Sequence, residues 1–317
     1  MTEINVSVVI GAGIMGHGIA QLMAAQGLKV HLVDRDRACL NRARGWIEDN
    51  LSFMIELGEP VEGGPEKVLD NIDFTPDLAG ALPEADFVIE AVNEDFELKR
   101  RIWISMGLYA SSKAVLASNT SSYDINELTA TVPFPGRIVG THWFHPPQIT
   151  PCVEVIPCSG ADPEKVDLVL NFLTWLGKVP TLCKSTPGFV ANRIQLALVA
   201  EALSLVEEGL AEPEEVDQIV KNSFGFRLGA YGPFEVIDQA GADTYLGVYE
   251  YLYKKLGREH FRPSEVLKKQ VEMGRLGLKS SGGFYDYEQD AADLVRRDRD
   301  RKLYARLRLL HHEAQAG

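Results

Sequence analysis

The feature that most constrains the fold is a glycine-rich turn near the start of the chain. Val6–Ile10 has the composition of a buried strand, and Gly11, Gly13 and Gly16 follow it in the arrangement G-x-G-x-x-G. Helical periodicity begins inside the motif, over residues 14–26. The first glycine permits a tight turn, the second lets a pyrophosphate approach the backbone, and the third lets helix and strand pack closely. The pattern predicts a dinucleotide-binding unit.

An acidic residue follows the second predicted strand, which covers residues 28–33. Asp34 stands at the distance from the glycines where a carboxylate accepts hydrogen bonds from the ribose hydroxyls of NAD. The same carboxylate would repel the 2′-phosphate of NADP, whereas the neighbouring Arg35 could pair with that phosphate. FAD shares the glycine fingerprint, but the sequence has no second flavin signature. We therefore predict NAD as the cofactor.

Strand and helix patterns divide the chain into two parts. Further strands are predicted over residues 87–90, 114–118 and 138–141, with helices over 37–57 and 96–108. Later in the chain, helices are predicted over residues 189–209, 213–222, 242–256, 263–273 and 290–312. The sequence thus predicts an α/β fold, with a doubly wound parallel-sheet Rossmann domain over residues 1–185 and an all-helical substrate and dimerisation domain over 186–317.

Composition excludes several classes of partner. The formal net charge is −13, which argues against nucleic acid, because phosphate binding favours a basic surface. A membrane-spanning helix needs about 18 consecutive apolar residues, and no apolar run in the sequence approaches this length. No targeting pattern is visible either, so a cytoplasmic location is expected. The four cysteines form no C-x-x-C pair and are expected to be free thiols. The apolar helical part is short of internal partners, which predicts a homodimer.

Several further segments carry a specific signal when they are taken in order. They read SNTSS over residues 118–122, GTHWFHPP over 140–147, VEVI over 153–156, TPGFVANR over 186–193, GRLGLK over 274–279 and GGFY over 282–285. Together they resemble the 3-hydroxyacyl-CoA dehydrogenase family over nearly the whole chain, to about residue 287. The resemblance implies an NAD-dependent enzyme that moves a hydride between the cofactor and the hydroxyl carbon of a 3-hydroxyacyl-type substrate.

The resemblance implies His142 as the catalytic base and Glu154 as its partner. The chemistry agrees, because imidazole titrates near neutral pH and can take the hydroxyl proton as the hydride leaves. A carboxylate on the second ring nitrogen fixes the tautomer and stabilises the imidazolium. The resemblance also implies that Ser121 and Asn192 hydrogen-bond the reacting oxygen of the substrate.

The resemblance places three further residues beside the cofactor. Glu94 and Lys99 match family positions near the nicotinamide and its ribose, and Asn119 matches another cofactor contact. His142 and His145 are two possible metal ligands, but no third ligand follows at a usual spacing, so we predict no metal.

Three departures from the family concern the substrate. His145 stands where the family usually has Asn. The insert after the second strand is rich in Lys and Ser in members that use CoA, but here it is acidic, with Lys67 as its only lysine. Arg227 has a counterpart in relatives of the gulonate and carnitine dehydrogenase types, which act on free hydroxy acids. An acidic surface repels the phosphates of CoA, and a guanidinium suits a carboxylate.

These departures favour a free hydroxy carboxylate as the substrate. The main alternative is a true L-3-hydroxyacyl-CoA (3-hydroxybutyryl-CoA) dehydrogenase of fatty-acid metabolism, with Arg227 at the surface or in a dimer interface. An alternative of another class is a non-catalytic, crystallin-like NAD-binding protein, against which the paired His142 and Glu154 argue. Dehydrogenases of the 6-phosphogluconate and 3-hydroxyisobutyrate types use a catalytic lysine in the helical domain, where this chain offers Asn192.

Overall fold

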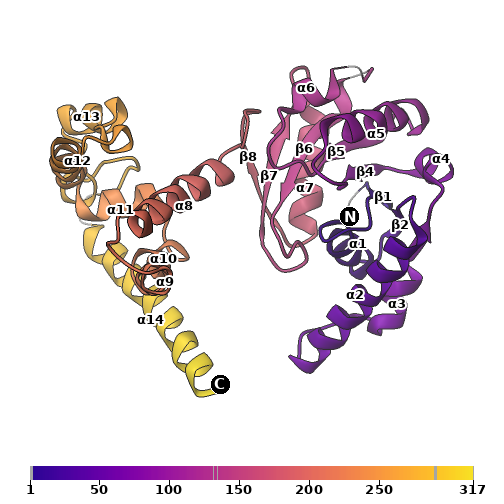
Figure 1. The fold of residues 1–317 in the computed structure, drawn as a ribbon, viewed down its shortest axis with the longest axis horizontal. Helices are drawn as coiled ribbons and strands as arrows, with labels where there is room; N and C mark the ends of the chain where they lie inside the picture. The colour runs from indigo at the N-terminus through magenta and orange to yellow at the C-terminus, as the bar shows by residue number, and fades with distance from the viewer. Residues whose placement is uncertain (1–2, 131, 134, 289–290, 317) are drawn as a thin grey trace. The chain divides into compact units, whose positions relative to one another are not determined.

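The computed structural model describes residues 3–130, 132–133, 135–288 and 291–316, which form two compact units, Met1–Val199 and Ala200–Gly317 (Figure 1). The first unit is built on an eight-stranded sheet of order β3-β2-β1-β4-β5-β6-β7-β8. The strands are β1 (Val6–Ile10), β2 (Lys29–Val33), β3 (Ile72–Thr75), β4 (Phe87–Glu90), β5 (Val115–Ser118), β6 (Ile138–Trp143), β7 (Cys152–Pro157) and β8 (Val179–Leu182). The predicted fold class is confirmed.

All pairs of strands are parallel except β6 and β7. The connection between these two strands is residues 144–151, too short to hold the crossover that a parallel pair needs. The alternation of strands and helices in the sequence did not predict β7 or its antiparallel pairing, and it also missed β3 and β8. Strands β3 and β8 lie at the edges of the sheet and are only partly buried, so they lack a continuous apolar run, and β8 contains Pro180, which an edge strand tolerates.

Helices cover both faces of the sheet. They are α1 (Gly16–Ala25), α2 (Arg37–Glu56), α3 (Gly64–Asp70), α4 (Leu78–Ala81), α5 (Phe96–Tyr109), α6 (Ile125–Thr129) and α7 (Pro163–Trp175). Successive strand residues point to opposite faces, so Val9 packs in a cluster with α1, α2, α3 and α7, while Val8 packs in a second cluster with α5 and α6. Strands β4 and β5 are buried at every position, as central parallel strands should be.

The second unit is helical. It contains α9 (Pro213–Asn222), α10 (Phe224–Leu228), α11 (Pro233–Ala240), α12 (Ala242–Leu256), α13 (Glu265–Glu272) and α14 (Ala292–Ala316). The short helices α10 and α11 were not predicted from the sequence. The division between the compact units falls inside α8 (Ala191–Glu207). The boundary between residues 185 and 186 stays a prediction.

A buried carboxylate organises the end of the second unit. Asp238 of α11 is 1% exposed and accepts hydrogen bonds from the backbone N–H groups of Phe284 and Tyr285, both at 2.9 Å, and from the phenol of Tyr287 at 3.0 Å. A Cβ at Gly277 or Gly283 would overlap Asp238, so glycine is needed at both positions. The GGFY segment and Tyr287 therefore enclose this carboxylate, while Gly277 of the GRLGLK segment lies against the backbone of Asp238.

We expect Asp238→Asn to lower the free energy of unfolding by about 2 kcal/mol, because an amide cannot accept all of these hydrogen bonds. The fall should appear in the urea midpoint and in the Tm. The control is Asp243→Asn, which removes an exposed partner of Lys279 and should change stability little. Equal effects of the two substitutions would contradict the role of Asp238.

Candidate active site

The turn between β1 and α1 is shaped for a phosphate group. Gly11 has a φ of +106°, and a Cβ there would lie 2.7 Å from the carbonyl oxygen of Ala91. A Cβ at Gly16 would overlap the carbonyl oxygen of Gly11. A Cβ at Gly13 would meet nothing within 4 Å, so the backbone here is open to a ligand. The free N–H groups at the start of α1 add a partial positive charge.

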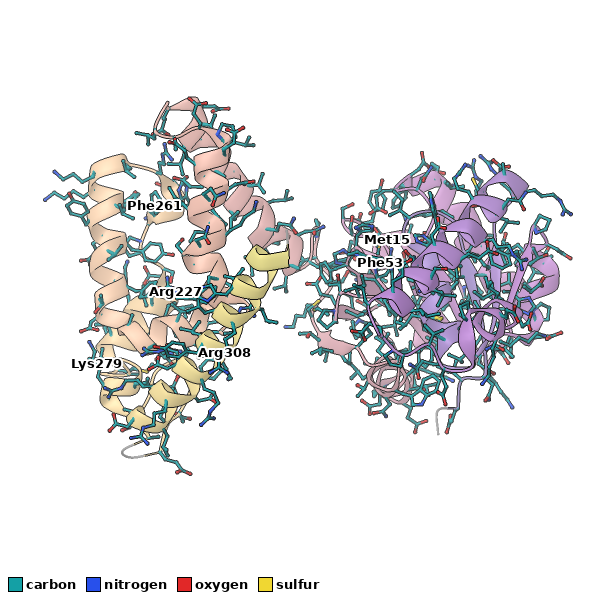
Figure 2. The ribbon with its side chains drawn as sticks, turned by 90° about the horizontal axis from the view of Figure 1, so that it is seen from below. Met15, Phe53, Arg227, Phe261, Lys279 and Arg308 are labelled. Atoms are coloured by element: carbon teal, nitrogen blue, oxygen red, sulfur yellow. The ribbon has the colours of Figure 1, made fainter. Side chains whose placement is uncertain are left out.

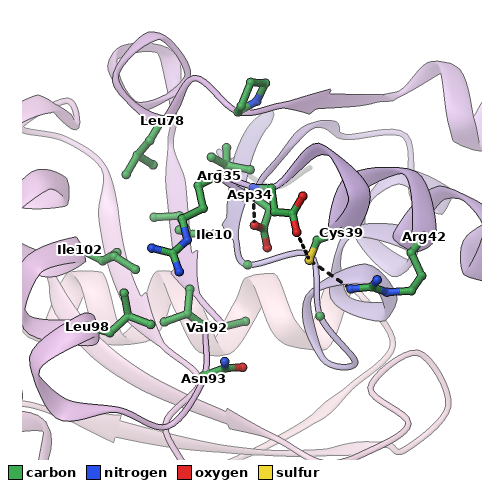
Figure 3. Close-up of a pocket in the computed structure, with 16 residues that line it drawn as sticks. Ile10, Asp34, Arg35, Cys39, Arg42, Leu78, Val92, Asn93, Leu98 and Ile102 are labelled. Atoms are coloured by element: carbon green, nitrogen blue, oxygen red, sulfur yellow. Dashed lines mark hydrogen bonds between the residues drawn. The ribbon is translucent and has the colours of Figure 1, made fainter.

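A cavity of about 490 Å³ lies beside this turn and is lined by Gly11, Gly13, Asp34 and Arg35 (Figure 3). The Asp34 carboxylate is oriented by two backbone donors, the N–H of Ala12 to Oδ2 and the N–H of Asp36 to Oδ1, both at 3.0 Å. Each carboxylate oxygen keeps a further acceptor position. These residues therefore fit the adenosine half of a dinucleotide, with the Asp34 oxygens available to ribose hydroxyls.

Glu94 and Lys99 lie in a network of ion pairs at the ends of β4 and β5. Lys99 is 1% exposed, and its Nζ is 2.6 Å from Oε1 of Glu90 and 3.1 Å from Oε2 of Glu94. Burial raises the pKa of Glu94, but hydrogen bonds from Thr120 and Ser122 and the charge of Lys99 outweigh it and hold that pKa below its ordinary value. The ammonium group of Lys99 is thus paired with two carboxylates of the same chain, those of Glu90 and Glu94.

The antiparallel pairing of β6 and β7 sets His142 directly opposite Glu154. Both side chains are buried, and Nδ1 of His142 is 2.7 Å from Oε2 of Glu154. The other carboxylate oxygen accepts the backbone N–H groups of Val190 and Ala191, at 3.0 and 2.9 Å, where α8 begins. A proton on Nδ1, shared with Glu154, leaves Nε2 of His142 as a proton acceptor.

Ser121 and Asn192 are joined through the first turn of α8. Nδ2 of Asn192 donates to the carbonyl oxygen of Ser121 at 2.9 Å. Oδ1 of Asn119 accepts the backbone N–H of Trp143 at 2.9 Å, next to His142. Four segments that lie far apart in the sequence therefore meet at the carboxyl ends of β5 and β6. They are residues 118–122, 140–147, 153–156 and 186–193.

The loop after β6 is anchored by a residue that the sequence did not single out. Lys178 is 6% exposed, and its Nζ donates to the carbonyl oxygens of Pro147 at 2.6 Å and Thr150 at 2.9 Å. Burial lowers the pKa of Lys178. His145 is exposed in the same loop. On α1, burial lowers the pKa of His17, and repulsion from His145 lowers it further. A hydrogen bond to the carbonyl oxygen of Gly13 raises this pKa but does not offset the other two effects.

Arg227 lies in the second unit, where its side chain is exposed on α10 (Figure 2). It forms no ion pair with any carboxylate of residues 3–130, 132–133, 135–288 and 291–311. Nη1 of Arg306 on α14 donates to the carbonyl oxygen of Gly229 at 2.7 Å, and Nζ of Lys302 is 5.6 Å from the ring centre of Tyr231. The segment that follows Arg227 is therefore bordered by further cations.

The insert after β2 is acidic at its surface. Its exposed carboxylates are Glu48, Asp49, Glu56, Glu59 and Glu62. In the part of the chain that the structure covers, no group of three or more His, Cys, Asp or Glu side chains is arranged to hold a metal ion. Within that same part, no helix combines the length and the apolar character that crossing a membrane requires.

Comparison with known proteins decides the family. The profile described as "3-hydroxyacyl-CoA dehydrogenase, NAD binding domain" matches residues 6–186, and the profile of the C-terminal domain matches residues 188–287. The chain belongs to the 3-hydroxyacyl-CoA dehydrogenase family. It is an NAD-dependent oxidoreductase that acts on a CH–OH group. The predicted family, cofactor and enzyme class are confirmed.

Three relatives of this dehydrogenase align with it over almost their whole length. A probable 3-hydroxybutyryl-CoA dehydrogenase of Deinococcus radiodurans is 39% identical over 88% of this chain and 99% of its own. The 5-formyl-3-hydroxy-2-methylpyridine 4-carboxylate 5-dehydrogenase of Mesorhizobium japonicum is 33% identical over 95% of this chain and 97% of its own. The crystal structure of a 3-hydroxyacyl-CoA dehydrogenase of Archaeoglobus fulgidus has a TM-score of 0.80 and 32% identity, over 96% and 99% of the two chains.

Proposed function

We propose that this dehydrogenase oxidises the hydroxyl group of a small 3-hydroxy carboxylate, with His142 as the base and Glu154 as its partner. The observation that carries the proposal is the buried contact of 2.7 Å between these two side chains. NAD supplies the hydride acceptor. Nε2 of His142 takes the hydroxyl proton, and the Glu154 carboxylate stabilises the imidazolium that forms.

Ser121 and Asn192 complete the proposed site. Asn192 uses one amide hydrogen on the carbonyl oxygen of Ser121 and keeps the other for the reacting oxygen of the substrate. The Ser121 hydroxyl, which lies a long 3.5 Å from Oε1 of Glu94, is proposed as the second donor. Two donors near this oxygen stabilise the charge that develops on it.

We expect His142→Ala to lower kcat by roughly 10²–10⁴, the usual contribution of a general base, with little change in the Kd of NAD. Glu154→Gln should also slow turnover, because the imidazolium loses its compensating charge. Steady-state kinetics and a binding titration measure the two quantities. His260→Ala, at an exposed histidine of the second unit, is the control and should turn over normally. Near-normal turnover of His142→Ala would refute the mechanism.

Three observations support a free carboxylate over a CoA thioester. The exposed acids of the insert repel a polyanion such as CoA. Arg227 is exposed, lacks a carboxylate partner among the described residues, and suits a substrate carboxylate. The Mesorhizobium relative is named for a pyridine 4-carboxylate. The second candidate is a 3-hydroxyacyl-CoA substrate, which the name of the Deinococcus relative favours.

We expect Arg227→Ala to raise the KM for a free 3-hydroxy acid at least about tenfold, since a charged hydrogen bond contributes about 1.5–3 kcal/mol. The KM for NAD should not change, and acetoacetyl-CoA should be a poor substrate of the unmodified enzyme. A panel of free hydroxy acids and 3-hydroxyacyl-CoAs, followed by NADH absorbance, tests this. Arg262→Ala, at another exposed arginine of the second unit, is the control. Efficient acetoacetyl-CoA reduction that is insensitive to Arg227→Ala would establish the CoA substrate instead.

The enzyme is proposed to act as a homodimer. Helix α8 has no buried residue, although it is rich in apolar side chains. Large apolar side chains of the helical unit are more than half exposed in the single chain, among them Leu203 at 59%, Leu210 at 66%, Ile219 at 60% and Tyr251 at 61%. Surfaces of this kind are usually covered by a partner.

We expect light scattering to give a mass of twice the 35.0 kDa of the chain. Leu203→Asp, in the apolar surface of α8, should shift the mass toward that of one chain, because a charge cannot be buried there without a partner. Glu214→Ala, a change at an already polar position of α9, is the control. A monomer at micromolar concentration would contradict the dimer.

A further inference from the structure

We propose that the buried carboxylate of Glu90 gives the nicotinamide end of the cofactor site a net negative charge, which favours binding of NAD⁺ over NADH. The proposal concerns the cofactor alone and does not depend on the identity of the substrate. Glu90 is not among the residues that the motifs of the sequence single out.

Glu90 is the last residue of β4 and is 0% exposed. Its Oε1 accepts from Nζ of Lys99 at 2.6 Å and from the backbone N–H of Val92 at 3.0 Å. Its Oε2 accepts from the hydroxyl of Ser118 at 2.8 Å. All three partners are donors, which is the pattern of an ionised carboxylate, because a protonated one would also have to donate.

The contacts of Glu90 continue into a closed ring of hydrogen bonds and ion pairs. Lys99 also pairs with Glu94 at 3.1 Å, and Glu94 accepts the hydroxyl of Thr120 at 2.5 Å. The backbone N–H of Thr120 donates to the Ser118 hydroxyl at 3.1 Å, and that hydroxyl donates to Glu90. The ring joins the ends of β4 and β5 to α5, so its charges are held in place.

The ring contains two carboxylates and one ammonium, and so carries a net charge of one negative unit. Glu94 stays ionised at neutral pH, since its pKa lies below the ordinary value for the reasons given above. Among the residues that the structure describes, no cation other than Lys99 lies within ion-pair distance of Glu90 or Glu94. The excess charge is therefore not neutralised locally.

The position of the ring follows from the topology of the sheet. The strand order reverses between β1 and β4, and a dinucleotide crosses a doubly wound sheet at this point, outside the carboxyl ends of the strands. Asp34 marks the adenosine half, beyond β2. The other half falls at the ends of β4 and β5, where Glu90 and Ser118 are the last residues. Asn93, which lines the cavity in Figure 3, directly precedes Glu94.

The charge of the nicotinamide group of the cofactor changes during the reaction. The nicotinamide ring carries one positive charge when oxidised and none when reduced, so a fixed negative charge beside it stabilises the oxidised form selectively. Charges near a protein surface interact less strongly than charges in its interior, and Glu94 is one-third exposed, with 34% of its side chain accessible. We therefore expect this charge to shift the ratio of the two dissociation constants toward NAD⁺ by roughly five- to tenfold.

The test is Glu90→Gln, which keeps the size of the side chain and removes one negative charge. The Kd of NAD⁺ and the Kd of NADH are each measured by calorimetric titration of the protein without substrate, at one ionic strength. We expect the ratio Kd(NAD⁺)/Kd(NADH) to rise roughly five- to tenfold, mainly because NAD⁺ binds more weakly. Damage to the site alone would weaken both forms equally and leave the ratio unchanged.

The double variant Glu90→Gln/Lys99→Met returns the net charge to that of the unmodified ring, so the ratio should return toward its original value. Glu97→Gln, at an exposed acid on the same helix as Lys99, is the control and should not change the ratio. Should Glu90→Gln fail to fold, Glu94→Gln removes the same charge from the accessible side of the ring and must also raise the ratio. An unchanged ratio in the folded Glu90 variant, or in its Glu94 substitute, overturns the proposal.

Discussion

The antiparallel hydrogen bonding of β6 and β7 is the constraint on which the proposed chemistry depends. It places His142 and Glu154 opposite one another, so that the contact between them is a cross-strand pair. The far side of Glu154 is held by backbone N–H groups at the start of α8. A strand added in parallel would have required a crossover helix, and the short loop with His145 would not have existed. The pair of His142 and Glu154 and the loop beside it thus arise from one reversal of chain direction.

Buried carboxylates recur as organising centres of this molecule. Glu90, Glu154 and Asp238 are each almost fully buried, and each accepts several hydrogen bonds, at least one of them from a backbone N–H group. Burying a charge is costly unless it is paired and hydrogen-bonded, and these contacts meet that condition. Because at least one donor to each carboxylate comes from a segment distant in sequence, the carboxylate also fixes the arrangement of those segments.

The two ends of the active site differ in how they are built. The cofactor end relies on the backbone, with the turn from Gly11 to Gly16 and the N-terminus of α1, and a set of glycines can specify it. Recognition of the substrate is instead proposed to depend on individual side chains, such as Arg227. A change of substrate within one family needs only the second kind of change.

The sequence by itself determined the class of fold and the cofactor. The spacing of Gly11, Gly13 and Gly16 after a β-rich run admits few alternatives, and the long helices have enough turns for their periodicity to be read. The existence of β3, β7 and β8 and the antiparallel direction of β7 were decided by tertiary structure. Strands β3 and β8 are partly exposed edge strands without the continuous buried apolar run that marks β4 and β5 in the sequence. Tertiary structure also decided the distant donors to Glu90 and Asp238, namely Ser118, 28 residues from Glu90, and Phe284, 46 residues from Asp238. A buried charge is satisfied by whatever the folded chain brings within about 3 Å of it, and nothing local to that residue encodes this.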